Sequence, residues 1–163
     1  MKRLLLALLI TSISQVLNPP LPVSTLTKGE VIYYKILKNK PTIDKTYARK
    51  LATVIAVKTS KYNINASKYT AILAQESGYR LNAVNHKSKD YGLSQINIKT
   101  AKAFNFDINR LLVDMEYSVE AGLIVLADFK KRYGHKEIDF WTRYNSSNKQ
   151  KRTMYKKLVV GYM

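Results

Sequence analysis

The sequence contains no cysteine and only two histidines, His86 and His135. Without cysteine the fold has no disulfides, so its stability must come from packing. Zinc sites built on thiolate ligands are excluded for the same reason, and two isolated histidines do not make a histidine-rich metal site. We therefore expect neither a metal nor a cofactor.

Acidic residues are also scarce: 11 Asp and Glu stand against 28 Lys and Arg, which gives a net charge of +17. A chain this basic is expected to collect on polyanions such as nucleic acid, anionic lipid headgroups or the acidic polymers of a cell envelope. Composition alone does not choose among them. The hydrophobic fraction of 46% is ordinary for a globular protein, and the length allows one domain and a leader.

A short apolar run near the start of the chain narrows the choice. Leu4–Ile10 follows the basic pair Lys2 and Arg3 and precedes small and polar residues. This order is typical of a secretory signal peptide, and we expect residues 1–14 to be removed by a cut after Ser14. The run is too short to span a bilayer, which needs about 20 apolar residues.

Two other interpretations of this run stay open, namely a buried N-terminal helix and an uncleaved tether that extends through Leu17. Export favours a periplasmic, cell-envelope-associated or extracellular location, and it weighs against nucleic acid as a partner. Cleavage after residue 14 would lower the net charge from +17 to +15, because Lys2 and Arg3 would be lost.

The rest of the chain divides into an arm and one domain. Residues 15–43 are rich in proline and indicate a linker or N-terminal arm, in which Glu30–Lys38 forms a short strand or helix. Residues 44–163 are predicted to form an all-α domain without a β-hairpin, because their apolar residues follow helical spacing. The predicted helices are Asp44–Tyr62, Ser67–Ser77, Ile98–Phe104, Ser118–Tyr133, Ile138–Tyr144 and Lys149–Val160.

Four residues mark the ends of these helices. Asp44 is expected in the cap or first turn of one helix, and Ser67 at the N-cap of the next. Gly78 and Gly134 are suited to positions just past helix ends, because glycine tolerates the left-handed backbone found there.

One carboxyl group has an unusual place in this pattern. Tyr69, Ile72, Leu73 and Glu76 fall at positions i, i+3, i+4 and i+7, so Glu76 shares the apolar stripe of its helix. Burial and the negative end of the helix dipole both disfavour the anion. A glutamic acid held near a pKa of ~6 suits general acid catalysis at a glycosidic oxygen. Helical spacing alone leaves open a half-exposed boundary residue or a pair with one of the many Lys and Arg side chains.

Three blocks in order carry a resemblance to a known family: Gln75–Val84 with its Glu-Ser pair, Tyr91–Asn97, and Arg143–Ser147. Together they resemble the lysozyme-like lytic transglycosylases of the soluble (SLT) type, with their Glu-Ser, Gly-Leu-Met-Gln-Ile and Ala-Tyr-Asn-Ala-Gly blocks. The resemblance covers about residues 44–160. The spacer that includes Asp90 is similar to that of short members associated with secretion systems and phage particles, whose components are therefore possible partners.

The resemblance implies an all-α, lysozyme-like single domain with a cleft that binds the glycan strands of peptidoglycan. Glu76 matches the single catalytic acid/base of the family, and Ser77 matches the residue that supports it. The remaining matched positions imply substrate binding, by the loop at one wall of the cleft and by the floor near the bond that is cut: Gly92, Leu93, Gln95, Ile96, Tyr144 and Asn145.

The implied reaction uses one carboxyl group twice and needs no metal or cofactor. Glu76 protonates the oxygen between N-acetylmuramic acid and N-acetylglucosamine and then takes the proton of the sugar's 6-hydroxyl, which leaves a 1,6-anhydro end. Three departures from the family pattern put fine positioning in doubt. Ser94 replaces Met, Ser118 replaces Asn with the expected loss of a structural hydrogen bond, and Ser146-Ser147 replaces Ala-Gly.

Other functions stay open at this point. Asp90 could position a water, which would give lysozyme-type hydrolysis of the same bond. The chain could also bind cell wall without turnover, or bind nucleic acid, although it has no recognisable nucleic-acid-binding signature. Core packing is expected for Phe140 and Trp141 rather than sugar stacking. The basic C-terminal cluster is either a solvated helix face or an attachment to anionic envelope polymers: Lys149, Lys151, Arg152, Lys156 and Lys157.

Overall fold

The computed structural model describes residues 26–163, so the predicted signal peptide, residues 1–14, lies outside the described residues. Helices make up most of the described range, which confirms the mostly helical class expected from the sequence. No helix in this range is long and apolar enough to cross a membrane. The elements are α1 (Lys28–Asn39), α2 (Lys45–Lys61), α3 (Ala66–Ser77), β1 (Val84–Asn85), β2 (Asp90–Tyr91), β3 (Ile96–Asn97), α4 (Ile98–Phe104), α5 (Ile108–Val113), α6 (Met115–Tyr133), the 3-10 helix η2 (Phe140–Tyr144) and α7 (Lys149–Gly161).

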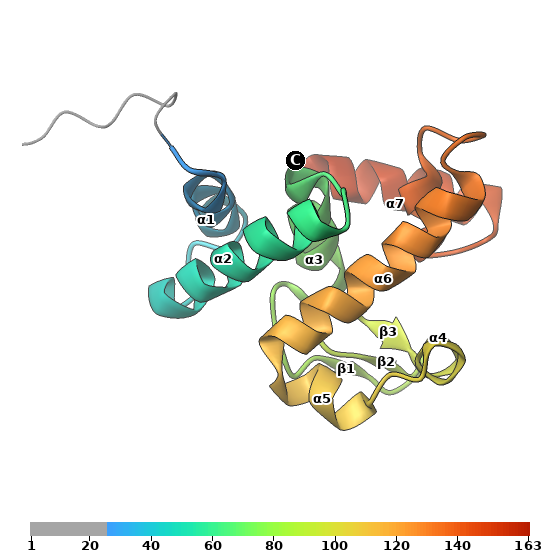
Figure 1. Ribbon diagram of the computed structural model, residues 1–163, viewed down its shortest axis with the longest axis horizontal. Coiled ribbons are helices and arrows are strands. Elements are labelled where there is room, and N and C mark those ends of the chain that lie inside the picture. Colours follow the sequence, from blue (N-terminus) through green and yellow to red (C-terminus); the bar gives the residue numbers. More distant parts are fainter. Residues whose placement is uncertain (1–25) are drawn as a thin grey trace, which may run out of the picture.

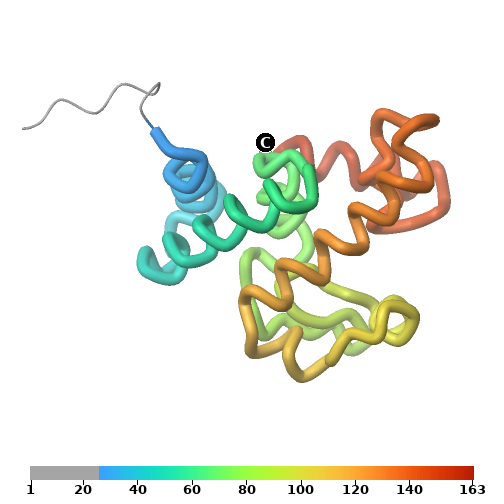
Figure 2. The backbone as a smooth tube through the Cα atoms, in the orientation of Figure 1, coloured from blue at the N-terminus to red at the C-terminus, as the bar shows by residue number. Residues whose placement is uncertain are grey.

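Helix α6 runs diagonally across the molecule and separates two regions (Figure 1). On one side lie α1, α2, α3 and α7, which share the main hydrophobic core with α6. On the other side lie the small sheet, α4 and α5, which pack against α6 around a second, smaller cluster. The chain path in Figure 2 shows residues 80–114 forming this second region as one continuous excursion between α3 and α6.

Helix α1 covers and extends Glu30–Lys38, where we expected a short strand or helix within a linker or N-terminal arm. Thr27 caps it, since its hydroxyl accepts a bond from the Glu30 amide and the Glu30 carboxylate accepts one from the Thr27 amide. Ile32, Tyr33 and Ile36 on one face are buried in the main core. Residues 28–39 are therefore a packed helix and not a linker. The sequence left open whether this segment is a helix or a strand, because it is short and rich in Val, Ile and Tyr, as strands are. Its buried residues nevertheless follow the helical period of 3.6.

The predicted ends of α2 and α3 are largely confirmed. The Asp44 carboxylate accepts a 2.7 Å bond from the Tyr47 amide and caps α2. Gly78 ends α3 in the left-handed conformation, with φ +57°. The N-cap of α3 is Asn65 and not Ser67, because the Asn65 side chain accepts a 2.9 Å bond from the Lys68 amide.

Helix α6 begins three residues before the predicted start and directly follows α5, which we did not predict. The Asp114 side chain accepts a 3.0 Å bond from the Tyr117 amide and so caps α6. Gly134 follows the last residue of α6, as expected, but its backbone is right-handed, with φ −61°, and not left-handed like that of Gly78. Near the C-terminus, η2 is a short 3-10 helix within the predicted helix 138–144, and α7 matches the predicted Lys149–Val160 to within one residue.

The three strands contradict the expectation that residues 44–163 contain no hairpin. They form an antiparallel sheet in the order β1-β2-β3, with Val84 opposite Tyr91 and Tyr91 opposite Ile96. Each strand has only two residues. Such strands are too short to show the alternation of apolar and polar residues by which strands are recognised in a sequence.

Candidate active site

Glu76 lies in the last turn of α3 on the stripe predicted from the sequence. Tyr69, Ile72 and Leu73 on that stripe are each 0% exposed, and Glu76 itself is half-buried. The left-handed turn at Gly78 stops the helix two residues later. The carboxyl group is therefore held at the edge of the core, where part of its hydration is lost.

The pKa of Glu76 is raised from 4.5 to about 7. Burial is the largest cause, because it disfavours the charged form. The negative charge of Asp90 raises the pKa further, and a hydrogen bond from Tyr155 opposes both effects. The sequence argument anticipated burial as a cause, but it did not anticipate the influence of Asp90.

Tyr155 in α7 is the residue at this site that sequence reasoning missed. Its phenol donates a 2.5 Å hydrogen bond to Oε1 of Glu76, and the residue is only 3% exposed. Its ring packs against Trp141 with a centroid separation of 6.2 Å. The spacing of Tyr155 and Val159, which are buried on one face of α7, marks Tyr155 as inward-facing. No local signal connects it with a glutamate 79 residues earlier.

The loop between β2 and β3 needs glycine at position 92. Gly92 has φ +77°, and a Cβ built there would lie 2.3 Å from the Leu111 carbonyl oxygen. The backbone at Gly92 therefore packs closely against α5. Leu93 and Ile96 are buried, with 0% and 2% exposure. Their side chains pack into the two hydrophobic clusters and anchor the loop, so they are not accessible from solvent.

Gln95 sits at the tip of the same loop with φ +45°. Its side-chain NH₂ donates bonds of 3.1 and 2.9 Å to the carbonyl oxygens of Ala83 and Gly92. Both amide hydrogens are thus directed to the backbone. The carbonyl oxygen of the half-buried Gln95 side chain accepts no hydrogen bond within residues 26–163.

A buried polar cluster anchors this loop to α3 and α6. Ser94 Oγ lies 2.9 Å from both Tyr69 Oη and the Ser118 carbonyl oxygen. The Ser118 hydroxyl accepts a 3.0 Å bond from the Leu93 amide. We expected the change from Asn to Ser at position 118 to lose a structural hydrogen bond, but the Ser118 side chain does make one. Gly122 leaves room for the cluster, since a Cβ there would meet Ser94 Oγ and Tyr69 Oη at 2.4 Å.

Tyr144 and Asn145 end η2 on the other side of this loop. The Tyr144 phenol donates a 2.7 Å bond to the Ser94 carbonyl oxygen. Its pKa is raised well above the usual value by burial and by the charges of Tyr69 and Glu76. Asn145 is exposed, and its side chain makes no hydrogen bond within residues 26–163, so it faces solvent beside Tyr144.

Ser77 and Asp90 are both engaged with their own segments. The buried Ser77 hydroxyl donates a 3.2 Å bond to the Leu73 carbonyl oxygen and not to Glu76. Asp90 accepts bonds from Asn97 Nδ2, at 2.7 Å, and from the Ser88 hydroxyl. Asp90 is therefore oriented by the hairpin, while its charge raises the pKa values of Glu76 and Tyr144.

A groove of about 330 Å³ adjoins Glu76. Of the predicted site residues it includes Glu76 and Ser77, while Gln95, Tyr144 and Asn145 lie outside its lining. Its other walls come from residues that we did not predict, at the ends of α1, α3 and α7: Asn39, Lys40, Gln75, Arg80 and Tyr162.

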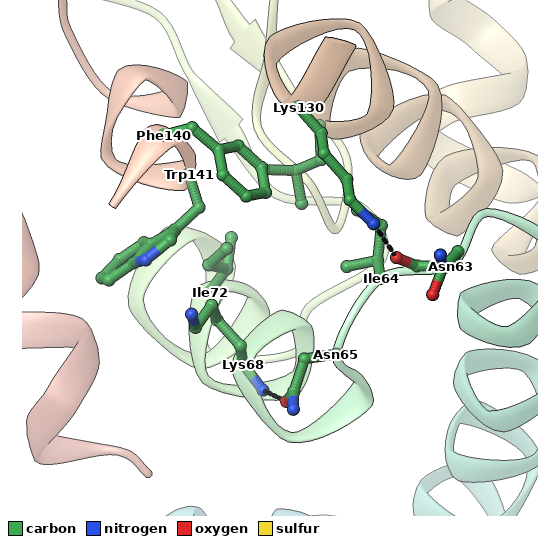
Figure 3. A pocket seen from close by; sticks show the side chains of 9 residues that line it. Asn63, Ile64, Asn65, Lys68, Ile72, Lys130, Phe140 and Trp141 are labelled. Carbon is green, nitrogen blue, oxygen red and sulfur yellow. Dashed lines mark hydrogen bonds between the residues drawn. The ribbon is translucent and has the colours of Figure 1, made fainter. Parts of the chain in front are cut away.

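A second cavity of about 380 Å³ lies near the start of α3, away from Glu76. Figure 3 shows Ile72, Phe140 and Trp141 around it, with Lys130 bonded to the Asn63 carbonyl oxygen at its edge. Trp141 is 2% exposed, which confirms the expected core packing. Within residues 26–163 no three His, Cys, Asp or Glu side chains gather as a metal site.

The arrangement suits proton transfer at one carboxyl group beside an open groove. Comparison with known families matches residues 53–157 to the transglycosylase SLT domain. A search of curated proteins found no match. The matched segment spans well over half of the chain and includes α3, the sheet, η2 and most of α7. The chain therefore belongs to the transglycosylase SLT domain family, whose activity is lytic cleavage of peptidoglycan.

Proposed function

We propose that this protein is a peptidoglycan lytic transglycosylase that cuts the β-1,4 bond between N-acetylmuramic acid and N-acetylglucosamine, with Glu76 as its general acid and base. The observation that carries the proposal is that Glu76, a half-buried glutamic acid beside a groove, has a pKa of about 7. Near neutral pH such a group is protonated about half of the time, so it can give a proton in one step and accept one in the next.

In the first step Glu76 protonates the glycosidic oxygen, and the bond from that oxygen to the anomeric carbon of N-acetylmuramic acid breaks. Positive charge develops on the sugar ring while Glu76 becomes a carboxylate. The Tyr155 phenol, bonded to Oε1, stabilises this anion by hydrogen bonding. In the second step Glu76 takes the proton of the 6-hydroxyl as its oxygen bonds to the anomeric carbon. The carboxyl group ends protonated, and the product ends in 1,6-anhydro-muramic acid.

The other matched residues bind and align the strand in this proposal. Gln95 presents its side-chain oxygen to a sugar donor, because its NH₂ is already bonded to the backbone. Tyr144 and Asn145 contact sugar beside the loop. Gly92, Leu93 and Ile96 keep the loop in place, and Ser77 acts through the end of α3 that carries Glu76.

We also propose that the protein acts outside the cytoplasm, as the predicted leader and the location of peptidoglycan both favour. Anionic envelope polymers are a second proposed partner. Lys149, Lys151 and Lys157 on α7 are exposed, whereas Arg152 and Lys156 of the same cluster pair with Glu137 and Asp139. The spacing around Asp90 further supports components of a secretion system or phage particle as partners.

The decisive experiment compares wild-type protein with Glu76→Gln on purified cell walls, with products identified by mass spectrometry. Wild type should release anhydro-muropeptides, and Glu76→Gln should release them about a thousandfold more slowly. Glu116→Gln is the matched control, because it makes the same exchange at a glutamate in α6 whose side chain is 65% exposed. Circular dichroism should show that both variants are folded.

The same digest separates the alternatives. Products with ordinary reducing ends would establish lysozyme-type hydrolysis, which the influence of Asp90 on Glu76 makes the second candidate. Wall binding by wild type without any soluble product would establish a non-catalytic wall-binding protein. Release of the same products by Glu76→Gln at a rate close to that of wild type would show that another residue moves the proton.

A further inference from the structure

The groove beside Glu76 is built partly from segments outside the family match at 53–157. Asn39 is the last residue of α1, Lys40 follows it, and Tyr162 follows α7. The Asn39 side chain donates bonds of 3.0 Å to Tyr79 Oη and 3.2 Å to the Tyr162 carbonyl oxygen. One amide group thus fixes the end of α1 against both α3 and α7, and the groove has a defined shape next to the carboxyl group.

Two cationic side chains line this groove, and the end of α3 holds both. Lys40 Nζ donates a 2.8 Å bond to the Gly78 carbonyl oxygen, and Arg80 Nε donates a 3.0 Å bond to the Ser77 carbonyl oxygen. Carbonyl groups at a helix C-terminus attract such cations. Each side chain uses one of its donors in this way, so the lysine keeps two N–H groups and the arginine keeps four for other acceptors.

The protein does not neutralise these two charges. Among residues 26–163, eight salt bridges involve other cations, and neither Lys40 nor Arg80 takes part in one. The carboxyl group in the same groove, Glu76, has a pKa of about 7, so near neutral pH it carries its negative charge only about half of the time. The groove therefore presents net positive charge and oriented donors immediately beside the proposed point of cleavage.

We propose that this groove binds the carboxylates of the peptide stems of peptidoglycan, with Lys40 and Arg80 as the residues that recognise them. The proposal rests on the transglycosylase function and adds a preference for strands that carry free stem carboxylates. In intact strands the N-acetylated sugars are uncharged, and the lactyl group of muramic acid is tied up in its amide with the stem. The stem carboxylates are then the only anions next to the bond that is cut.

The test uses three forms of one glycan preparation: intact strands, strands whose carboxylates have been converted to amides with carbodiimide and ammonia, and strands stripped of stems by an amidase. Amidation removes the charge and keeps the peptide. Stripping removes the stem and leaves only the lactyl carboxylate on the sugar. Wild type should cut intact strands with kcat/KM about tenfold above the other two forms, the effect of one or two charge-assisted hydrogen bonds.

The ratio of kcat/KM for intact over amidated strands should fall to about threefold in Lys40→Gln and in Arg80→Gln, and to about one in the double variant. Lys40→Arg and Arg80→Lys keep the charges and should keep the ratio. Lys38→Gln is the matched control, because Lys38 is exposed on the same helix and does not line the groove. Added salt should lower the wild-type ratio.

Equal rates of wild type on intact and amidated strands would overturn the proposal, and so would a ratio that both Gln variants retain. Fast cutting of stripped strands would assign the charge recognition to the lactyl carboxylate and would also overturn it. These results leave the transglycosylase function standing, because cleavage is still seen. Absence of wild-type turnover on all three forms would instead contradict the function itself.

Discussion

Two glutamates on neighbouring helices of this basic protein have opposite electrostatic surroundings. Glu120 in α6 accepts hydrogen bonds from Lys58 at 2.7 Å and Lys61 at 2.6 Å and from the Tyr62 phenol at 2.8 Å. The bond from Lys58 is the largest cause that lowers its pKa to about 2. From the sequence, pairing with a Lys or Arg side chain was one open interpretation of Glu76. Glu120 is the residue that makes such a pair.

Glu76 lacks any such partner among residues 26–163. Its hydrogen bond comes from the neutral phenol of Tyr155, and its pKa is about 7. The chain has 28 Lys and Arg, and the nearby cations Lys40 and Arg80 are turned to backbone carbonyl groups of α3. A cation paired with Glu76 would keep it ionised and useless as an acid. The proposed mechanism accounts for this difference, because proton transfer at position 76 requires a carboxyl group that can be neutral, whereas the ion pairs of Glu120 contribute to stability.

The largest expected effect is on catalysis. Glu76→Gln should lower kcat/KM on cell walls by about 10³-fold, within the range that general acid–base catalysis contributes. Glu120→Gln should leave kcat/KM unchanged, because Glu120 is engaged with Lys58 and Lys61. Anhydro-muropeptide release, followed with time by mass spectrometry, measures both. A comparable loss in Glu120→Gln would break the comparison.

The second effect is on stability, and its sign depends on pH. The folded pKa of Glu76, about 7, lies above the unfolded value near 4.5, so the folded state holds its proton more tightly. The contribution of this proton to stability is fully present below pH 4.5 and is lost as the pH rises through 7. Glu76→Gln cannot ionise and should gain up to about 3 kcal/mol over wild type at pH 8, with no gain at pH 4.

Urea unfolding of wild type and Glu76→Gln at the two pH values measures this difference. The variant would then be more stable and inactive, as expected where a functional group is kept in an unfavourable environment. If the two proteins differ equally at pH 4 and pH 8, the buried carboxyl group does not carry the raised pKa that the mechanism requires.

The third effect has the opposite dependence on pH. The pKa of Glu120 is lowered to about 2, so its ion pairs contribute stability that is present above pH 4.5 and lost as the pH falls through 2. Its side chain is 23% exposed, and partly solvated pairs are weak. Glu120→Gln should therefore cost about 1 kcal/mol at pH 7. The cost should shrink at low pH and in 1 M salt, as urea unfolding can show.

Local patterns in the sequence predicted the parts of the site that one helix determines. The stripe from Tyr69 to Glu76 and the stop at Gly78 depend only on helical geometry and on the backbone freedom of glycine, so both were recognised. The cap at Asn65 was missed because Asn65 and Ser67 are both good capping residues, and the choice between them depends on which side chain reaches the Lys68 amide.

Contacts between distant segments could not be predicted in this way. The hydrogen bonds from Tyr155 to Glu76 and from Asn39 to the Tyr162 carbonyl oxygen depend on how α1, α3 and α7 pack. The small sheet has strands too short for a periodic signal, although Gly92, in the loop between β2 and β3, was identified through the family resemblance. Fold and catalytic candidate thus came from local periodicity and motif order, while the surroundings that set the pKa came from tertiary structure.

The smallest expected effect concerns the two neighbours that set the pKa of Glu76. Donation by Tyr155 lowers that pKa and the charge of Asp90 raises it. Because the acid form of Glu76 starts the reaction, kcat/KM should fall about tenfold per pH unit above a pH near 7. Tyr155→Phe should move this alkaline limb to higher pH, and Asp90→Asn should move it to lower pH, each by less than about one unit. A pH profile of kcat/KM on soluble glycan strands measures both shifts. Two variants whose limbs move in the same direction would contradict the assignment of the limb to Glu76, since no other described carboxyl group has these two neighbours with opposing effects.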